Sequence, residues 1–248
     1  MHPELFTKAL LRGVEAGGGS VLITTVTGLE VEGGRVAGVR TTDPQGVHSL
    51  LPADVVVLAL GPWSSLLPAW LPPGPGGALP AVSGLKVHSI VLKAPAGPRA
   101  PGADALFLAY RGADGKSLEP EVYPRPEGQG VYVCGVSQEG AVLPERADGV
   151  APQAGAAAAL RAVAASVSRE LGDAAVLKEQ ACFLPCTEDG LPLIGAVPGL
   201  AGAYIATGHS FWGILNAPAT GEAIAELILE GKASRVDLAA FDPARAFL

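Results

Sequence analysis

The 248-residue chain is predicted to be an α/β protein with mixed helices and strands, and three observations lead to this class. Residues 54–60 form a continuous apolar run without alternation, which is typical of a strand buried on both faces of an α/β core. Residues 202–206 are expected to form a short strand, followed directly by a glycine-bearing loop and a helix. Residues 82–137 hold short strand-like runs separated by turn residues, which indicates an antiparallel sheet.

The N-terminal part is expected to contain one helix followed by strands. Residues 3–16 carry apolar side chains one helical turn apart, with a proline in the first turn and three glycines after the segment. The apolar residues 21–23 predict a short strand. Residues 25–31 and 35–41 flank a Gly-Gly pair, which predicts a β-hairpin.

A segment rich in Pro and Gly at 68–80 predicts a boundary in the middle of the chain. The strands expected after it are 86–92, 105–110, 121–123 and 131–136. Residues 152–171 have an apolar stripe at helical spacing, with a proline at the start and a glycine after the end. This pattern predicts one helix over the sheet.

Composition and charge exclude several classes of protein. The formal net charge is −7 and lysines and arginines do not cluster, which argues against a nucleic-acid surface. No apolar run approaches the roughly 18–20 residues needed to span a bilayer. The three cysteines give no even disulfide framework, and no basic segment followed by an apolar stretch opens the chain. These observations predict a cytoplasmic globular protein.

The last third of the chain holds the strongest candidate for a functional site. Residues 207–214 connect the strand at 202–206 to a helix that Asn216 is expected to cap, with Pro218 in its first turn and Gly231 at its end. A helix N-terminus presents free N–H groups and about half a positive charge, so it can hold partial negative charge. The alternative is an ordinary strand–helix connection whose glycines only make the turn.

Two single residues are candidates for substrate placement. His209 could transfer a proton or orient a substrate, or it could be a loop histidine hydrogen-bonded to the backbone. Arg125, between two prolines, could anchor a carboxylate through a bidentate contact, or it could be a solvated loop arginine. Glu188 and Asp189 are interpreted as a turn before Gly190 rather than as an acid/base pair.

No metal site is expected. The scattered histidines have no paired spacing of the kind that zinc needs, so Cys182 and Cys186 are interpreted as inert thiols. The chain also contains no GxGxxG that follows a strand and opens a helix. That pattern holds the pyrophosphate of a dinucleotide, so the pyrophosphate cradle is missing from the sequence.

Two C-terminal motifs resemble those of a known family. Residues 182–195 read CFLPCTEDGLPLIG, and residues 204–221 read YIATGHSFWGILNAPATG. Both resemble the end of FAD-dependent oxidoreductases of the D-amino-acid oxidase, glycine oxidase and sarcosine oxidase type. Residues 54–64, ending in Gly-Pro-Trp-Ser, resemble the middle section of these proteins. Residues 121–135 resemble a subgroup of uncharacterised oxidoreductases, and the resemblance spans nearly the whole chain.

The resemblance implies oxidation of the C–N bond of an amine or amino acid by hydride transfer to FAD. It implies that 1–80 and 176–248 are the remainder of a Rossmann-like FAD-binding domain, interleaved with an antiparallel-sheet substrate domain at 81–175. The family's glycine-rich βαβ unit has no match here, so Met1 is expected to be an internal position of a longer protein. Arg125 and His209 would place the substrate. The implied FAD-contacting residues are Val26, Ala59, Gly61, Trp63, Gly208, His209, Ser210, Phe211, Trp212, Gly213 and Ile214.

The resemblance also bears on how FAD is held. Cys182 stands near the position of a covalent flavin in the sarcosine oxidase branch, but noncovalent FAD is expected here. The alternative is a non-catalytic remnant, or a binding or regulatory protein that no longer holds FAD, and the missing pyrophosphate cradle motivates it. A Cys- or Ser-based hydrolase is a more distant alternative, because the sequence has no nucleophile-elbow pattern.

Overall fold

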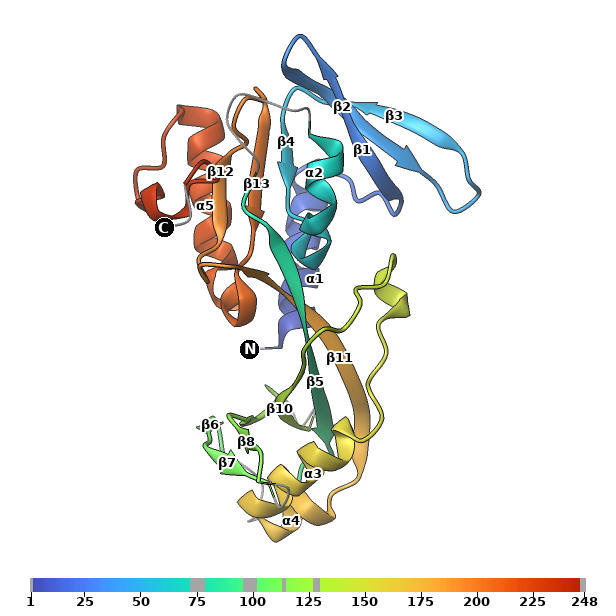
Figure 1. Cartoon of the computed structure of the whole chain (residues 1–248), viewed down its shortest axis with the longest axis vertical. Coiled ribbons are helices and arrows are strands. Elements are labelled where there is room, and N and C mark those ends of the chain that lie inside the picture. The colour runs from blue at the N-terminus through green and yellow to red at the C-terminus, as the bar shows by residue number, and fades with distance from the viewer. Residues whose placement is uncertain (1, 72–78, 96–101, 113–114, 127–129, 246–248) are drawn as a thin grey trace. The chain divides into compact units, whose positions relative to one another are not determined.

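The computed structural model describes residues 2–71, 79–95, 102–112, 115–126 and 130–245 (Figure 1). The chain forms two compact units: unit 1 comprises residues 1–13 and 85–183, and unit 2 comprises residues 14–84 and 184–248. Helices and several sheets occur together, so the mixed α/β class is confirmed. The centre of the predicted boundary at 68–80 lies outside the described residues. No helix among the described residues is long and apolar enough to cross a membrane.

Unit 1 is built on a five-stranded sheet of order β11-β5-β10-β9-β6, and the pairs of β10 with β5 and β9, and of β6 with β9, are antiparallel. Its strands are β5 (Val82–Leu92), β6 (Leu106–Phe107), β9 (Glu121–Pro124), β10 (Val131–Gln138) and β11 (Val176–Thr187), with a separate ladder of β7 (Tyr110–Arg111) and β8 (Ser117–Leu118). The predicted antiparallel sheet is therefore confirmed. The single strand expected at 105–110 is instead split between β6 and β7, and β11 was not foreseen, because its polar residues hide the alternation.

Helices cover one face of this sheet. α3 (Ala156–Val167) and α4 (Arg169–Asp173) stand where one helix was predicted. The break falls at Ser168, whose hydroxyl accepts a hydrogen bond from the Leu171 N–H at 3.1 Å and so caps α4. The buried cluster beneath them is Ile90, Leu92, Val122, Val131, Val133, Leu160, Val163, Ala164 and Leu171. The predicted helix at 3–16 is confirmed as α1 (Pro3–Ala16), which has no buried residue.

One buried histidine fastens the long connection between β10 and α3. His88 of β5 is 1% exposed, and its Nδ1 lies 3.0 Å from the carbonyl oxygen of Val136. The backbone N–H of Gln153 donates to its Nε2 at 3.1 Å. Because Nε2 accepts, Nδ1 carries the proton and donates to Val136. The His88 ring therefore links β5 and β10 to the connection that leads to α3. Among its described residues this connection has one short 3-10 turn, Ala147–Gly149.

Unit 2 contains a three-stranded sheet of order β1-β2-β3, formed by β1 (Thr25–Glu32), β2 (Arg35–Thr42) and β3 (His48–Pro52). The predicted hairpin is confirmed as the antiparallel pair β1–β2. The predicted strand at 21–23 is wrong: these residues have no regular structure, and Ile23 is 85% exposed. Apolar composition alone does not make a strand where no partner strand is available.

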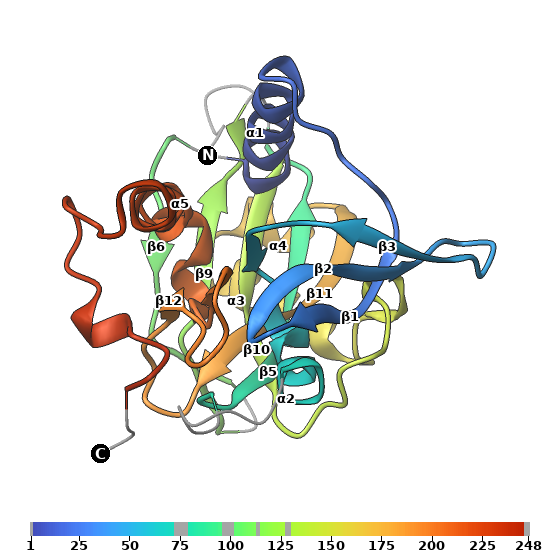
Figure 2. The same cartoon turned by 90° about the horizontal axis from the view of Figure 1, so that it is seen from above.

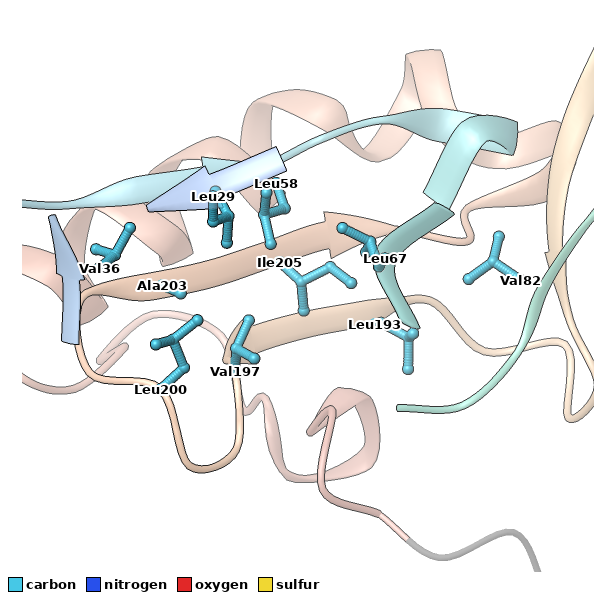
Figure 3. Close-up of a cluster of buried hydrophobic side chains, with 10 residues drawn as sticks. All are labelled: Leu29, Val36, Leu58, Leu67, Val82, Leu193, Val197, Leu200, Ala203 and Ile205. Carbon is cyan, nitrogen blue, oxygen red and sulfur yellow. The ribbon is translucent and has the colours of Figure 1, made fainter. Parts of the chain in front are cut away.

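A second three-stranded sheet in unit 2 has the order β12-β13-β4, from β12 (Leu193–Ala196), β13 (Ala203–Thr207) and β4 (Val56–Leu58). β13 is antiparallel to β12 and parallel to β4. One face packs on β1, β2 and the short helix α2 (Leu67–Trp70). Figure 3 shows this core, with Leu58 and Ile205 projecting from neighbouring strands and Leu67 from α2 turned toward Ile205. Helix α5 (Gly213–Glu230) contacts β12 and β13 and is seen nearly end-on in Figure 2.

Two predictions for this sheet need correction. The strand expected at 54–60 is only three residues long and is not buried on both faces, since Val55 and Val57 are 40% and 42% exposed. β4 is an edge strand of its sheet among the described residues. The last helix begins at Gly213, not at Asn216, because a 3-10 turn, Ser210–Trp212, runs straight into it. Pro218 therefore lies inside the helix, and Gly231 ends it as predicted.

Candidate functional site

The candidate site in unit 2 is formed by two loops that leave the same edge of a sheet. Because β4 and β13 are parallel, the segments after them start side by side. One is the turn Gly61–Leu66, and the other is residues 207–213, which lead into α5. This is the position at which open α/β sheets commonly bind ligands.

Hydrogen bonds through Thr207 tie these two loops together. The Ser64 hydroxyl donates to Thr207 Oγ1 at 2.8 Å, and Thr207 Oγ1 donates to the carbonyl oxygen of Gly61 at 3.2 Å. Ser64 is 3% exposed and Thr207 2% exposed. A buried hydroxyl pair of this kind fixes one backbone against the other, because leaving either group without its partner would cost free energy.

The backbone of both loops has left-handed residues. Gly61 has φ +54° and Gly208 φ +81°, and Ser210, at φ +50°, is the one residue other than glycine with positive φ among the described residues. A Cβ on Gly208 would lie 2.9 Å from Thr187 Cγ2. Strained backbone that its surroundings hold in place is common at binding sites.

The start of α5 is open and apolar. The exposed fractions are 62% for Phe211, 62% for Trp212, 40% for Ile214 and 68% for Leu215. No side-chain hydrogen bond caps the helix at Trp212, and the N–H groups of a first helical turn have no partner within the helix. An exposed apolar surface next to free N–H donors suits a flat aromatic group that carries negative charge.

His209 lies inside this loop but is held by a side chain rather than by the backbone. Its Nε2 is 2.9 Å from Thr220 Oγ1, about two turns into α5. Burial lowers the pKa of His209, so the ring is neutral at pH 7. This arrangement fits a residue that fixes the loop on the helix better than one that carries charge.

The remaining predicted residues divide between the two units. Gly61, Trp63 and residues 208–213 lie in the two loops, Ile214 lies in the first turn of α5, and the exposed Ala59 directly follows β4. Val26 lies on β1, where it pairs with Thr41, outside these loops. Arg125 belongs to unit 1.

In unit 1, Arg125 lies on a group of polar side chains that the sequence did not reveal. Its guanidinium carbon is 5.2 Å from the centre of the Tyr132 ring, and that ring is 5.0 Å from the ring of Tyr123. The next pair along the same two strands is Glu121 and Cys134, with Glu121 Oε2 3.9 Å from Cys134 Sγ. We call Glu121, Tyr123, Tyr132 and Cys134, with Arg125 above them, the tyrosine face.

Strand alternation explains why these residues share a face. Val131 and Val133 pack in the core under α3, so Tyr132 and Cys134 point to the opposite face. Burial raises the pKa of Tyr123 and of Cys134 to about 12, and raises that of Tyr132 further. Both phenols and the thiol therefore stay protonated at neutral pH, and the phenols can act as hydrogen-bond donors.

The other two cysteines do not form a site. Cys186 Sγ is 3.6 Å from Ser210 Oγ and from the Leu184 carbonyl oxygen. Cys182 is exposed, although the surrounding protein desolvates its thiol in part and raises its pKa. No group of three or more His, Cys, Asp or Glu side chains within the described ranges could hold a metal ion.

Comparison with known proteins shows where this arrangement belongs. The family model "FAD dependent oxidoreductase" (DAO) matches residues 1–227. A glycine oxidase of Pseudomonas putida is 32% identical over 218 residues, which cover 88% of this chain and 52% of that protein. A D-amino acid dehydrogenase of Cereibacter sphaeroides is 31% identical over 243 residues, 94% of this chain and 48% of that protein.

A solved structure agrees. Glycine oxidase from Geobacillus kaustophilus matches with a TM-score of 0.72 and 26% identity, over 94% of this chain and 55% of that one. The chain spans 34% to 52% of the length of the first curated relatives that it matches. The cofactor of this family is FAD. The chain thus belongs to the DAO family of FAD-dependent oxidoreductases.

Proposed function

We propose that this chain serves in the oxidation of the C–N bond of an amine or amino acid, with FAD as hydride acceptor. The observation that carries the proposal is the pair of loops at the carboxyl ends of β4 and β13, next to the open start of α5. The proposal assigns the flavin to unit 2 and the recognition of substrate to the tyrosine face of unit 1.

The residues present fit the ring end of the cofactor. A Cβ built on Gly61 meets no atom within 4 Å, and one on Gly213 meets only His209 Cβ, at 3.7 Å. A planar ring can therefore approach both backbones closely. Phe211, Trp212 and Ile214 offer apolar surface beside the helix start. The fit covers the isoalloxazine, since the sequence has no GxGxxG for the pyrophosphate.

FAD, when bound, accepts the hydride and its electron pair. The free N–H groups of the first turn of α5 stabilise negative charge near them, because they are not satisfied within the helix. Thr207 and Ser64 keep the two loops in register, and His209 holds the second loop on α5. These groups position the site and carry no proton in the reaction.

The tyrosine face suits the two charged groups of an amino acid. Arg125 can donate a bidentate pair of hydrogen bonds to a carboxylate, with Tyr132 beneath it. Glu121 lies on the same face, two residues before Tyr123 and four before Arg125 in the chain. A carboxylate on this face can accept a hydrogen bond from a substrate ammonium group.

The first experiment asks whether the chain holds FAD. Purified protein is mixed with FAD, desalted and examined by visible absorption, with Gly208→Ala as the test variant and Gly231→Ala as its matched control. Both glycines have positive φ, but only Gly208 lies in the loop. We expect a retained flavin spectrum for the wild type and Gly231→Ala and its loss in Gly208→Ala. A colourless wild type that is folded would contradict the proposal for this chain.

The second experiment asks what reduces the flavin. Anaerobic bleaching by amino acids and by simple amines is compared for the wild type, Arg125→Met and the control Arg169→Met, whose arginine lies on α4. Loss of a charge-assisted hydrogen bond costs about 1.5–3 kcal/mol, so kcat/KM for amino acids should fall about 10- to 150-fold in Arg125→Met only. Amines without a carboxylate should lose little. Equal loss for both substrate classes would refute the role of Arg125.

A non-catalytic binding role is the second candidate, and one observation favours it. β4 ends its sheet with Val55 and Val57 exposed, which leaves a flank suited to another polypeptide. A folded wild-type chain that loses all FAD on desalting would favour this candidate.

A cytoplasmic location also stays a prediction.

A further inference from the structure

The segment after α5 crosses unit 2 as a strap that is fixed at both ends. We call residues 232–245 the C-terminal strap. At its start, the Glu226 carboxylate accepts hydrogen bonds from the Ser234 N–H at 2.6 Å and from the Ser234 hydroxyl at 3.1 Å. Arg235 also pairs with Glu222 and Glu226 of α5. These contacts anchor the start of the strap to the exposed side of the helix.

The other end of the strap is anchored to the turn after β11. Arg245 pairs with Asp189 through two hydrogen bonds of 2.7 and 3.1 Å, and it also donates to the carbonyl oxygens of Leu191 at 2.7 Å and Pro192 at 3.0 Å. The Arg245 side chain is 12% exposed. A bidentate pair with two further carbonyl partners holds the strap end in one position.

Between these anchors the strap does not pack fully on the sheet and helix below. Near Gly195 it lies close, because a Cβ on that glycine would come within 2.8 Å of Pro243 Cδ. Beside this point two cavities remain, of about 320 and 270 Å³, which share Ile194 of β12 with Val236 and Leu238 of the strap. Both spaces are partly open to solvent, and their volumes are large enough for a small ligand.

The smaller cavity has an apolar body and one polar end. Ile194, Leu238 and Phe241 are among its apolar walls, and His209, Asn216 and Thr220 supply its polar groups. No charged side chain lines it among the described residues. The His209 ring is neutral at pH 7 because burial lowers its pKa. A charged ligand would lose hydration there without gaining a partner of opposite charge.

We infer that the 270 Å³ cavity beneath the C-terminal strap is a binding site for a small uncharged molecule with an aromatic or branched apolar body and one hydrogen-bonding group. Its polar end would meet Asn216 and His209, and its apolar part would lie between Ile194 and Phe241. Engineered apolar cavities of about 150 Å³ bind benzene, so the space is sufficient for a substituted aromatic ring. This site shares His209 with the loop assigned to the flavin, but Ile194, Leu238 and Phe241 lie outside that loop, so binding here can be tested without FAD.

The test uses benzyl alcohol and indole as probes and benzoate as the charged counterpart. Titration of the full chain is followed by amide chemical shifts in two-dimensional NMR and by the midpoint of thermal unfolding. We expect saturable shifts that centre on residues around Ala219 and Leu238, and a rise in the midpoint, for the two neutral probes. Benzoate should bind at least tenfold more weakly. Absence of saturable shifts with both neutral probes would overturn the inference.

A pair of variants on one helix locates the binding. Ala219 lines the cavity, whereas Ala225 is exposed on α5 and does not line it. Ala219→Phe should fill the space and weaken both neutral probes at least tenfold, and Ala225→Phe should bind them as the wild type does. If Ala219→Phe does not fold, Leu238→Phe fills the cavity from the strap side. Unchanged binding in a folded filling variant would refute the site.

Discussion

Unit 2 and unit 1 present their polar groups in different ways. At the carboxyl ends of β4 and β13, the groups that face a ligand belong mainly to the main chain: glycine backbones with positive φ and the free N–H groups of α5. On the tyrosine face of unit 1 they belong to side chains that project from alternate strand positions. A main-chain site depends on how the strand beneath it is packed, whereas a side-chain site can lose one group and keep its frame.

The largest expected effect is a loss of stability on truncating a core side chain, compared between unit 2 and unit 1. Ile205 and Ile90 are both 0% exposed, and each substitution to Ala should cost about 2–5 kcal/mol in the free energy of unfolding. Ile205 lies on β13, directly before the loop, so Ile205→Ala should also weaken FAD. Ile90→Ala should lower stability alone. Urea unfolding and FAD titration of both variants measure this, and equal loss of FAD affinity would break the comparison.

Backbone strain at the loop gives the next effect. Gly208→Ala places a Cβ 2.9 Å from Thr187 Cγ2 in a left-handed conformation, and should cost about 1–3 kcal/mol. Gly231→Ala has φ +76° and meets nothing within 4 Å, so it carries the conformational cost without the clash. Thermal unfolding of the two variants compares them. If Gly231→Ala lowers the unfolding midpoint as much as Gly208→Ala does, the close approach of the new Cβ to Thr187 does not contribute to the loss.

The loop at 207–214 and the tyrosine face show how much of the candidate site could be predicted from the sequence. The loop at 207–214 was found because a strand, glycines and a helix follow one another in the chain, and its main-chain chemistry depends on that order. The tyrosine face was missed because Tyr123 and Tyr132 are brought together only by the register of β9 with β10. Of the residues on this face, only Arg125 was singled out from the sequence, because it stands between two prolines. Alternation of Tyr132 and Cys134 with buried valines is the pattern that could have indicated the rest.

The same contrast explains the errors in the fold. Residues 21–23 and 54–60 have similar apolar runs, yet only Val56–Leu58 forms a strand, because β13 lies beside it as a partner. The start of α5 was placed four residues late, because Asn216 is a good cap in isolation whereas the residue at the cap position is Trp212. The 3-10 turn Ser210–Trp212 runs directly into the helix, which therefore starts at Gly213.

The third prediction concerns pH and the anchor of the strap in unit 2. Arg245 lowers the pKa of Asp189 to about 2, below the ordinary value of about 3.9. Its contribution is therefore present above pH 4 and is lost as the pH falls through about 2. Asp189→Asn should cost on the order of 1 kcal/mol at pH 7 and clearly less at pH 2, where about half of the carboxyl is protonated in the folded state.

The control for this prediction is Asp148→Asn. Asp148 pairs with Arg146 on the surface, where both side chains are about 70% exposed. Its loss should change the unfolding midpoint little at either pH, because exposed pairs contribute little. Urea unfolding at pH 7 and pH 2 measures both variants. A loss in Asp189→Asn that is the same at both pH values would mean that the ion pair is not its cause.

The smallest effect on stability tests the side-chain site. Tyr132→Phe removes one hydroxyl from a ring that keeps its tilted contact with Tyr123. The free energy of unfolding should change by no more than about 1.5 kcal/mol. Flavin retention should not change, whereas KM for amino acids should rise. A fall in FAD affinity would show that the tyrosine face is not confined to substrate.

The His88 ring also has a consequence for protein engineering. It fastens the connection between β10 and α3 at Gln153 and leaves the stretch before that point, around Gly140 and Val142, on the surface; Val142 is 88% exposed. Insertions are tolerated where backbone is exposed and not held by tertiary hydrogen bonds. A tag or a reporter domain placed at Gly140 would leave the sheet intact, whereas the same insertion next to Gln153 would pull the ring from its partner.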